Sequence, residues 1–335
     1  MERCTIIVDA RDHFSTTATC LETLFANTPE PFDLIVVIGG APERLKQAWQ
    51  ERFGERARFI FRPEFLNQAQ ARNIGLREAK TRLAVLMDND NFVRPGWLEA
   101  LLRCQQDTGA VMVVPLILET PRRIHTAGND LYITYDNGRA FGYKHLRYYR
   151  IGFHEGCNLK RRRTDYAELH CQLIEVEPTL RLGAYDERIL EVGEIDQGLI
   201  FAKAGREMWC EPASVVHFAL HSPLAVEDIR LFEWRWDIRR VHEGYQYFQE
   251  KWHLDVSEGG TFRDWLVRYN SHLGLLPRLW PSEFSLRLDR RLGQARERFV
   301  DLCLAPKYRY DKFRKRRLGY DDWTAGVSSN GKTLS

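Results

Sequence analysis

Several features that would assign this chain of 335 residues to a familiar class are missing. Its seven cysteines include no Cys-x-x-Cys pair, and an odd, scattered set favours reduced thiols over a disulfide framework. The longest apolar run, residues 110–118, is about half a bilayer span and contains Pro115, so no transmembrane helix is predicted. The N-terminus leads directly into a strand-like run at 5–8, which leaves no room for a signal peptide. These absences predict a cytoplasmic protein.

The net charge is also small, and the glycine motifs that bind phosphate are absent. A net charge of +3 implies no general attraction to nucleic acid, so no nucleic-acid partner is expected. Gly39-Gly40 lacks the Gly-x-Gly-x-x-Gly and Gly-Lys-Ser/Thr patterns, which argues against a dinucleotide site or a P-loop and favours a tight turn. Basic residues are concentrated at 160–163 and 307–317. We interpret both as solvated faces, although the second, with seven basic and three aromatic residues, leaves peripheral contact with a membrane surface open.

The first 115 residues alternate between strand and helix patterns. Apolar, β-branched runs predict strands, and apolar residues at helical spacing predict the helices between them. The strands are expected at 5–8, 32–38, 57–61, the run that ends at Asp88, and 111–114; the helices are expected at 17–27, 43–53, 67–80 and 97–106. This repetition predicts an α/β fold with a mostly parallel central sheet flanked by helices.

The later part of the chain has a different pattern. Asn137-Gly138 between aromatic runs predicts a hairpin, because Asn-Gly readily adopts the positive φ angles of a tight turn. After Ser222-Pro223, apolar residues recur every three or four positions from Leu231 to Trp252, which predicts one long amphipathic helix. Trp236 falls beside this stripe and is free to face a substrate or a partner. Further elements are predicted as a strand at 171–176, a helix at 191–203, a strand at 208–216 and a Ser/Gly-rich disordered tail from about 324.

One stretch suggests chemistry. The apolar run 83–87 leads directly into Asp88-Asn89-Asp90, and the carboxyl end of a central strand is where open α/β sheets bind ligands. Two carboxylates placed so closely are costly to hold without a cation. Asp and Asn are also common turn residues, so this motif alone favours a simple turn.

Six stretches occur together in the order of one family. The chain resembles the family 2 glycosyltransferases of the GT-A fold over roughly residues 4–220. The stretches that carry the resemblance are Ala71-Arg-Asn-Ile-Gly-Leu76, Leu86-Met-Asp-Asn-Asp90, Pro95-Gly-Trp-Leu98, Leu182-Gly-Ala-Tyr-Asp-Glu-Arg188, Gly193-Glu-Ile-Asp196 and Glu211-Pro-Ala-Ser-Val-Val-His217. The resemblance implies a GT-A domain over 1–220, with a nucleotide-sugar half at 1–115 and an acceptor and metal half at 116–220. A C-terminal helical extension over 221–323 and the tail 324–335 would follow.

The resemblance also implies roles for individual residues. Asp88, Asp90 and His217 would bind Mn²⁺ or Mg²⁺. Glu194 would be the general base, with Asp196 as the alternative. The residues expected to contact the nucleotide-sugar are Asp9, Arg11, Asp12, Arg72, Asn73, Asp88 and Asn89.

The implied activity is metal-dependent, inverting transfer of a sugar, of the hexosyltransferase kind, from a nucleotide-diphosphate sugar. The acceptor would be the hydroxyl of a saccharide or glycoconjugate, as in polysaccharide synthesis. Ile38-Gly39-Gly40 stands where the family usually has an Asp that reads the nucleotide base, so the donor base stays open. The same departure motivates an alternative, a catalytically inactive GT-A-like domain that binds carbohydrate or nucleotide. A nucleotidyltransferase is less favoured, because no Gly-rich, Lys-containing loop follows the first strand. The oligomeric state is not predicted.

Overall fold

The structure, a computed structural model, describes residues 3–29, 31–154, 157–219, 222–256, 272–293, 295–296, 298–299 and 302–303. The basic segment 307–317 and the tail 324–335 lie outside the described residues, so their predicted roles remain untested. In the part of the chain that is described, no helix is both long and apolar enough to cross a membrane.

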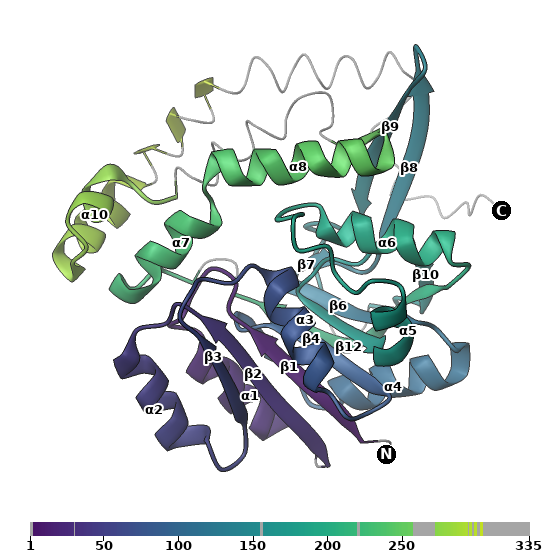
Figure 1. The fold of residues 1–335 in the computed structure, drawn as a ribbon, viewed down its shortest axis with the longest axis horizontal. Helices are drawn as coiled ribbons and strands as arrows, with labels where there is room; N and C mark the ends of the chain where they lie inside the picture. The colour runs from purple at the N-terminus through teal and green to yellow at the C-terminus, as the bar shows by residue number, and fades with distance from the viewer. Residues whose placement is uncertain are drawn as a thin grey trace.

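One ten-stranded sheet organises the molecule (Figure 1). The strand order is β10-β12-β6-β11-β4-β1-β2-β3, and β5 and β7 pair with β12 and β6. The neighbours β4, β1, β2 and β3 are parallel, whereas β11 runs antiparallel between β4 and β6. The bounds are β1 Cys4–Asp9, β2 Phe32–Gly39, β3 Arg58–Arg62, β4 Leu83–Asp88, β5 Asn91–Val93, β6 Met112–Thr120, β7 Arg123–Thr126, β10 Arg162–Thr164, β11 Cys171–Glu175 and β12 Met208–Phe218.

Helices cover both faces of this sheet. Side chains of β1 alternate between the two faces, so that Ile6 and Val8 pack in one buried cluster and Ile7 in the other. The first cluster contains residues of α1 (Thr17–Asn27), α2 (Glu43–Phe53) and α4 (Trp97–Thr108). The second contains residues of α3 (Gln68–Glu78), α5 (Val176–Arg181) and α6 (Gly193–Lys203). The predicted α/β fold with a mostly parallel sheet is therefore confirmed.

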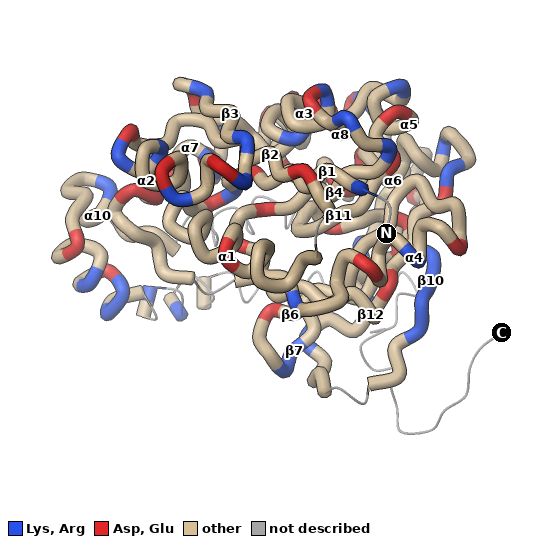
Figure 2. Tube along the Cα trace, turned by 90° about the horizontal axis from the view of Figure 1, so that it is seen from below, with Lys and Arg blue, Asp and Glu red and all other residues tan. Residues whose placement is uncertain are grey.

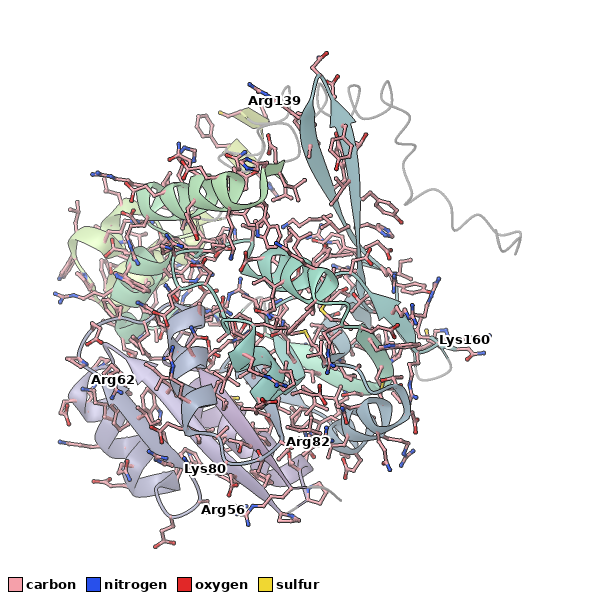
Figure 3. All side chains as sticks on the ribbon, turned by 45° about the vertical axis from the view of Figure 1, so that its right-hand side comes forward. Arg56, Arg62, Lys80, Arg82, Arg139 and Lys160 are labelled. Carbon is pink, nitrogen blue, oxygen red and sulfur yellow. The ribbon has the colours of Figure 1, made fainter. Side chains whose placement is uncertain are left out.

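The predicted hairpin is also present. It is formed by β8 (Asn129–Asp136) and β9 (Arg139–Leu146), with Asn137 and Gly138 at φ 49° and 76° in the turn. Arg139 marks the outer end of the hairpin, which projects from the body of the molecule (Figure 3). A short strand from the C-terminal part, β13 (Leu254–Asp255), pairs with β9 and ties the extension to the hairpin.

The arginine run near residue 160 lies at the surface (Figure 2). Arg161 pairs with Asp107 at 2.7 Å and with Glu211 at 2.5 Å, and Arg163 pairs with Glu207. These arginines are therefore matched by local carboxylates, in agreement with a solvated face.

The C-terminal extension differs from its prediction. Instead of one long helix, a 3₁₀ turn η1 (Val226–Asp228) and helix α7 (Ile229–Arg235) are followed by a break and by α8 (Ile238–Trp252). Asp237 adopts an extended conformation and caps α8 by accepting a hydrogen bond from the Arg240 backbone N–H at 2.8 Å. The prediction of a single helix was wrong, because the spacing of apolar residues does not reveal where a capping side chain ends one helix and begins the next. A further short helix, α10, covers Leu275–Leu279.

Asp228 anchors this extension to the turn after β1. Its fully buried carboxylate accepts hydrogen bonds from the Phe14 and Ser15 backbone N–H groups at 2.7 and 3.0 Å and from the Ser15 hydroxyl at 2.6 Å. It also accepts one from the Ala225 N–H at 2.8 Å. The start of the extension is thereby held against the carboxyl end of β1.

Candidate active site

The candidate site begins where β1 and β4 end side by side. Asp9 and Asp88 are direct partners in this parallel pair, and both are fully buried. Arg72 of α3 lies between them, with its Nε 3.0 Å from Asp9 Oδ1 and its Nη2 2.7 Å from Asp88 Oδ1. Because adjacent buried carboxylates repel each other, this buried guanidinium is needed to hold both in place.

The three carboxyl groups here ionise differently. Burial raises the pKa of Asp9 to about 7, against the opposing effect of Arg72. Burial and the neighbouring Asp88 raise the pKa of Asp90 to about 6. Burial also opposes ionisation of Asp88, but Arg72, His170 and Arg11 together hold its pKa below the usual value. The excess of buried carboxylate at Asp88 and Asp90 favours a bound cation.

His170 completes a group that is suited to a metal ion. Ligand atoms of Asp88, Asp90 and His170 all lie within 4.8 Å of one another, and all three residues are buried. His170 Nδ1 is 3.5 Å from Asp88 Oδ2, an oxygen that has no hydrogen-bond partner among the described residues. Carboxylate and imidazole ligands fit a divalent ion such as Mn²⁺. The sequence prediction missed His170, for which the only signal was its place directly before the strand that borders β4.

The predicted third ligand, His217, lies elsewhere. It sits inside β12 beside Phe218, whose ring packs on His170 with 4.0 Å between centroids. Since neighbouring residues of a strand point to opposite faces, His217 faces away from His170 and lies next to Phe92, 6.3 Å between centroids. Burial and the nearby Arg94 lower its pKa. Among the described residues His217 joins no group that could hold a metal ion, whereas His170 does.

The turn after β1 places two further predicted residues at the site. The Arg11 guanidinium lies 3.6 Å from Asp12 and 4.0 Å from Asp88 Oδ2. Its Nε is buried and has no hydrogen-bond partner among the described residues. Asp12 accepts a hydrogen bond from Trp236 Nε1 at 3.0 Å. Trp236 thus reaches the site from the C-terminal extension.

Two predicted nucleotide contacts are instead bound within the protein. Asn89 is fully buried, donates to Thr17 Oγ1 at 2.8 Å and accepts from the Arg11 backbone N–H at 3.3 Å. Asn73 donates to the Tyr185 carbonyl at 2.8 Å and accepts from the Tyr185 N–H at 3.0 Å. Both side chains hold the loops around the site in position.

The two candidates for the general base have different surroundings. Asp196 accepts a hydrogen bond from Trp252 Nε1 at 2.7 Å and pairs with Lys251 at 2.7 Å, so α8 occupies its carboxylate. Glu194, at the start of α6, pairs with Lys144 at 3.5 Å and with no other cation in the described part of the chain. Burial, followed by the charges of Glu168 and Glu191, raises the pKa of Glu194.

A second basic group comes from the end of α7. Arg235 is buried, pairs with Glu191 and lies 3.4 Å from Gln68 Oε1 through its Nη2. Gln68 in turn donates to Asp88 Oδ1 at 2.6 Å, so a single side chain links Arg235 to the carboxylate pair. The Nε and Nη1 atoms of Arg235 are buried without a hydrogen-bond partner among the described residues. The sequence prediction missed Arg235, because the periodic pattern placed it within one continuous helix.

Solved structures with the same architecture define the class. One is GalNAc-T7 with UDP, GalNAc and Mn²⁺, with a TM-score of 0.53 and 18% identity over 80% of this chain; this chain spans 55% of that one. Another is the mannosyltransferase PcManGT from Pyrobaculum calidifontis in complex with GDP-Man and Mn²⁺, with a TM-score of 0.51 and 14% identity over 93% of this chain and 88% of that one. The fold is therefore the GT-A glycosyltransferase fold with a C-terminal helical part.

The family follows from the sequence match. Residues 5–169 match the model of Glycosyl transferase family 2, and over this range the chain belongs to that family. No curated protein matches the chain. The predicted family and fold are thus both confirmed.

Proposed function

We propose that the protein is a metal-dependent, inverting glycosyltransferase that moves a sugar from a nucleotide-diphosphate sugar to an acceptor hydroxyl. The observation that carries this proposal is the buried group of Asp88, Asp90 and His170 at the carboxyl end of β4. Mn²⁺ or Mg²⁺ fits there, because Asp88 Oδ2 has no hydrogen-bond partner among the described residues and lies close to ligand atoms of Asp90 and His170. Such an ion, when bound, neutralises the negative charge that develops on a diphosphate leaving group.

The chain's own cations would hold the rest of the donor diphosphate. Arg11 and Arg235 both present buried guanidinium atoms without hydrogen-bond partners among the described residues. Arg11 lies beside Asp88, and Arg235 is linked to Asp88 through Gln68. Guanidinium groups bind phosphate oxygens in a bidentate manner. The donor would therefore lie between the turn after β1 and the end of α7.

Glu194 is the proposed general base. A base must be able to accept the proton of the acceptor hydroxyl, and Asp196 is already occupied by Trp252 and Lys251. Burial raises the pKa of Glu194 toward neutral pH, and a general base is most effective when its pKa lies near the operating pH. Direct displacement with this base would invert the anomeric centre, which NMR of the product can determine.

Nucleotide binding tests the metal site. The donor base is open, and the two similar structures contain UDP and GDP-Man, so UDP and GDP should be titrated by calorimetry with and without Mn²⁺. We expect Mn²⁺-dependent binding that Asp90→Asn abolishes. Asp107→Asn, a change in an exposed carboxylate on α4, should leave binding unchanged. Equal binding by wild type and Asp90→Asn would contradict the proposal.

Turnover separates the enzyme from the alternative, a GT-A-like protein that only binds carbohydrate or nucleotide. Hydrolysis or transfer should be measured over a panel of UDP-, GDP-, CMP- and dTDP-sugars with Mn²⁺ or Mg²⁺. Glu194→Gln should lower the turnover rate about 10²–10⁴-fold and leave nucleotide binding unchanged. Metal-dependent binding without turnover in the wild type would favour the alternative.

The role of Arg235 has its own measurement. Arg235→Met should weaken binding of a nucleoside diphosphate about 10–100-fold, because a charge-assisted hydrogen bond contributes about 1.5–3 kcal/mol. Binding of the corresponding monophosphate should change much less. Arg240→Met, which removes an arginine that packs on Trp234 of α7, is the matched control. Equal losses for mono- and diphosphate would remove Arg235 from the diphosphate site.

A further inference from the structure

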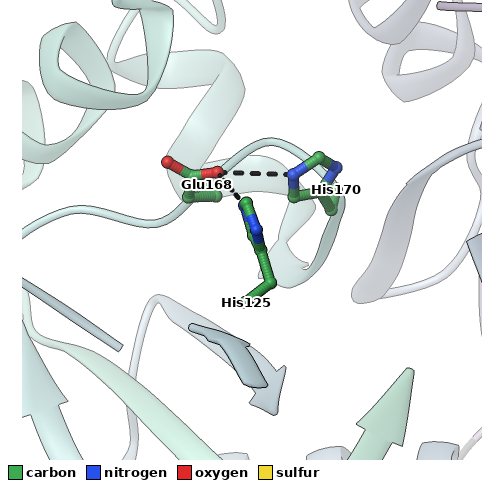
Figure 4. A group of neighbouring side chains, drawn as sticks. All are labelled: His125, Glu168 and His170. Atoms are coloured by element: carbon green, nitrogen blue, oxygen red, sulfur yellow. Dashed lines mark hydrogen bonds and ion pairs between the residues drawn. The ribbon is translucent and has the colours of Figure 1, made fainter. Parts of the chain in front are cut away.

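A second group of potential metal ligands lies next to the first. His125 comes from β7, and Glu168 and His170 come from the segment that leads into β11 (Figure 4). Both imidazoles direct Nε2 at the same carboxylate oxygen: His125 Nε2 is 3.1 Å and His170 Nε2 is 3.3 Å from Glu168 Oε2. Ligand atoms of all three residues lie within 4.8 Å of one another. This group shares His170 with the Asp88 group but uses the opposite ring nitrogen.

These separations match those between ligands of one small cation. Zinc binds imidazole nitrogen and carboxylate oxygen at about 2.0–2.2 Å in tetrahedral geometry, which places the ligand atoms roughly 3.3 Å apart. The two distances to Glu168 Oε2 agree with that spacing. The three side chains are therefore close enough to share one cation.

The outer nitrogens of both rings face carboxylates. His125 Nδ1 is 3.7 Å from Glu119 Oε2, and His170 Nδ1 is 3.5 Å from Asp88 Oδ2. All four atoms are buried and without a hydrogen-bond partner among the described residues, and the Glu119 side chain is only 1% exposed. A metal-binding histidine typically directs its other ring nitrogen at a carboxylate, which orients the ring and raises its basicity. His125 shows that arrangement with Glu119, while the outer nitrogen of His170 faces Asp88 of the first group.

The surroundings close one side of the group and leave another open. The Phe218 ring lies 4.0 Å from the His170 ring and 5.6 Å from the His125 ring, centroid to centroid. Glu168, by contrast, keeps 20% of its side chain exposed. Three protein ligands with one open direction are typical of zinc sites that bind water or substrate in the fourth position.

We propose that His125, Glu168 and His170 form a second cation site, which binds Zn²⁺ or a similar transition-metal ion with one coordination position open. Imidazole ligands select such ions, whereas the Asp88–Asp90 pair offers the oxygen ligands that suit Mg²⁺ and Mn²⁺. The charge of Glu168 raises the pKa of Glu194, so a cation bound at Glu168 would act on the proposed general base in the opposite direction. The site does not depend on the proposed function.

Co²⁺ is the probe for this site, because its visible absorption reports tetrahedral or five-coordinate nitrogen and oxygen ligation. The full-length protein, with any affinity tag removed and stripped of metal by a chelator, is titrated with Co²⁺, and Zn²⁺ binding is then followed by calorimetry. We expect one Co²⁺ band that Zn²⁺ displaces. His125→Ala should abolish the band and weaken Zn²⁺ binding more than about 100-fold, since loss of an outer carboxylate alone costs about 10–100-fold. Glu119→Gln should show that smaller loss.

Two control variants separate this site from other ligands. His145→Ala removes a histidine that also contacts a carboxylate, Asp130 at 3.1 Å, but lies outside both groups, so its titration should match that of the wild type. Asp90→Asn should keep the Co²⁺ band while losing Mn²⁺-dependent nucleotide binding. The proposed function and the second site can therefore fail separately.

Several results would overturn the proposal. No Co²⁺ band in the wild type would mean that the cluster is an ion-paired hydrogen-bond network only. A band that His125→Ala retains, or that Asp90→Asn removes, would assign binding to the Asp88 group instead. Circular dichroism and the thermal midpoint check that the variants fold. Should His125→Ala fail this check, His125→Gln, which can still donate to Glu168, replaces it with the same expected loss.

Discussion

The buried Arg72 offers the most decisive test of how the site is held together. Arg72→Met keeps the aliphatic part of the side chain but leaves Asp9 and Asp88 buried on adjacent strands without their shared cation. The Leu169 carbonyl also loses its donor. Removing one partner of a buried ion pair costs about 3–5 kcal/mol. We therefore expect the free energy of unfolding to fall by about that amount.

Arg77→Met is the matched control on the same helix. Its side chain is 60% exposed and lies 4.0 Å from Glu187, and exposed ion pairs contribute about 0–1 kcal/mol. Urea denaturation, followed by circular dichroism and tryptophan fluorescence, measures both variants against the wild type. Similar losses for the two arginines would refute the argument that Arg72 neutralises buried charge.

The pH dependence of this loss provides a second check. The folded-state pKa of Asp9 is already raised to about 7, and without Arg72 it should rise further. The pKa of Asp88, which Arg72 helps to hold below its usual value, should rise above its unfolded value. The folded state then binds more protons than the unfolded state, so its stability falls as the pH rises through that interval. The deficit of Arg72→Met should be smaller at pH 5 than at pH 8, and Asp9→Asn should restore part of it. A deficit that does not change with pH would contradict this account.

Three further predictions concern other parts of the fold. Asp228→Asn should lower the free energy of unfolding by about 1.5–3 kcal/mol at pH 7. Burial opposes ionisation of Asp228, but its hydrogen bonds lower its pKa below the usual value. The difference in unfolding free energy between wild type and Asp228→Asn should therefore disappear as the pH falls below about 4, which urea unfolding at several pH values measures. Gly75→Ala should cost about 1–3 kcal/mol by thermal unfolding, because a Cβ would lie 2.4 Å from a β1 side chain, whereas Gly152→Ala, with open space around it, should be neutral. Lys144→Met should shift the acidic limb of the kcat/KM pH profile to higher pH, because Lys144 lowers the pKa of Glu194; an unmoved limb would argue against Glu194 as the base.

Local pattern was enough to predict most elements of the first half. The helices at 17–27 and 43–53 have the predicted bounds, and the strands around Asp88 and after residue 32 lie where the apolar runs placed them. Periodicity succeeds here because each element buries one face against the sheet. It failed at Asp237, where a capping side chain ends one helix and starts another within an unbroken apolar stripe.

The site divides in the same way. The sequence by itself placed Asp88 and Asp90 at the end of a buried strand, because an apolar run that ends in two carboxylates needs no distant contact to be recognised. Their predicted role came from the family resemblance, since the motif alone favoured a turn. It also determined that Glu194 and Asp196 open a helix.

Only the tertiary structure decided which histidine joins the carboxylates. Strand pairing brings His170, which lies 82 residues further along the chain, beside Asp88, while alternation along β12 turns His217 to the other face. At the end of α7, tertiary packing likewise brings Arg235 to Gln68 of α3 and Trp236 to Asp12 in the turn after β1. The physical reason is the same in both cases: local spacing specifies the face of an element, but which other elements that face meets depends on strand order and on where helices end.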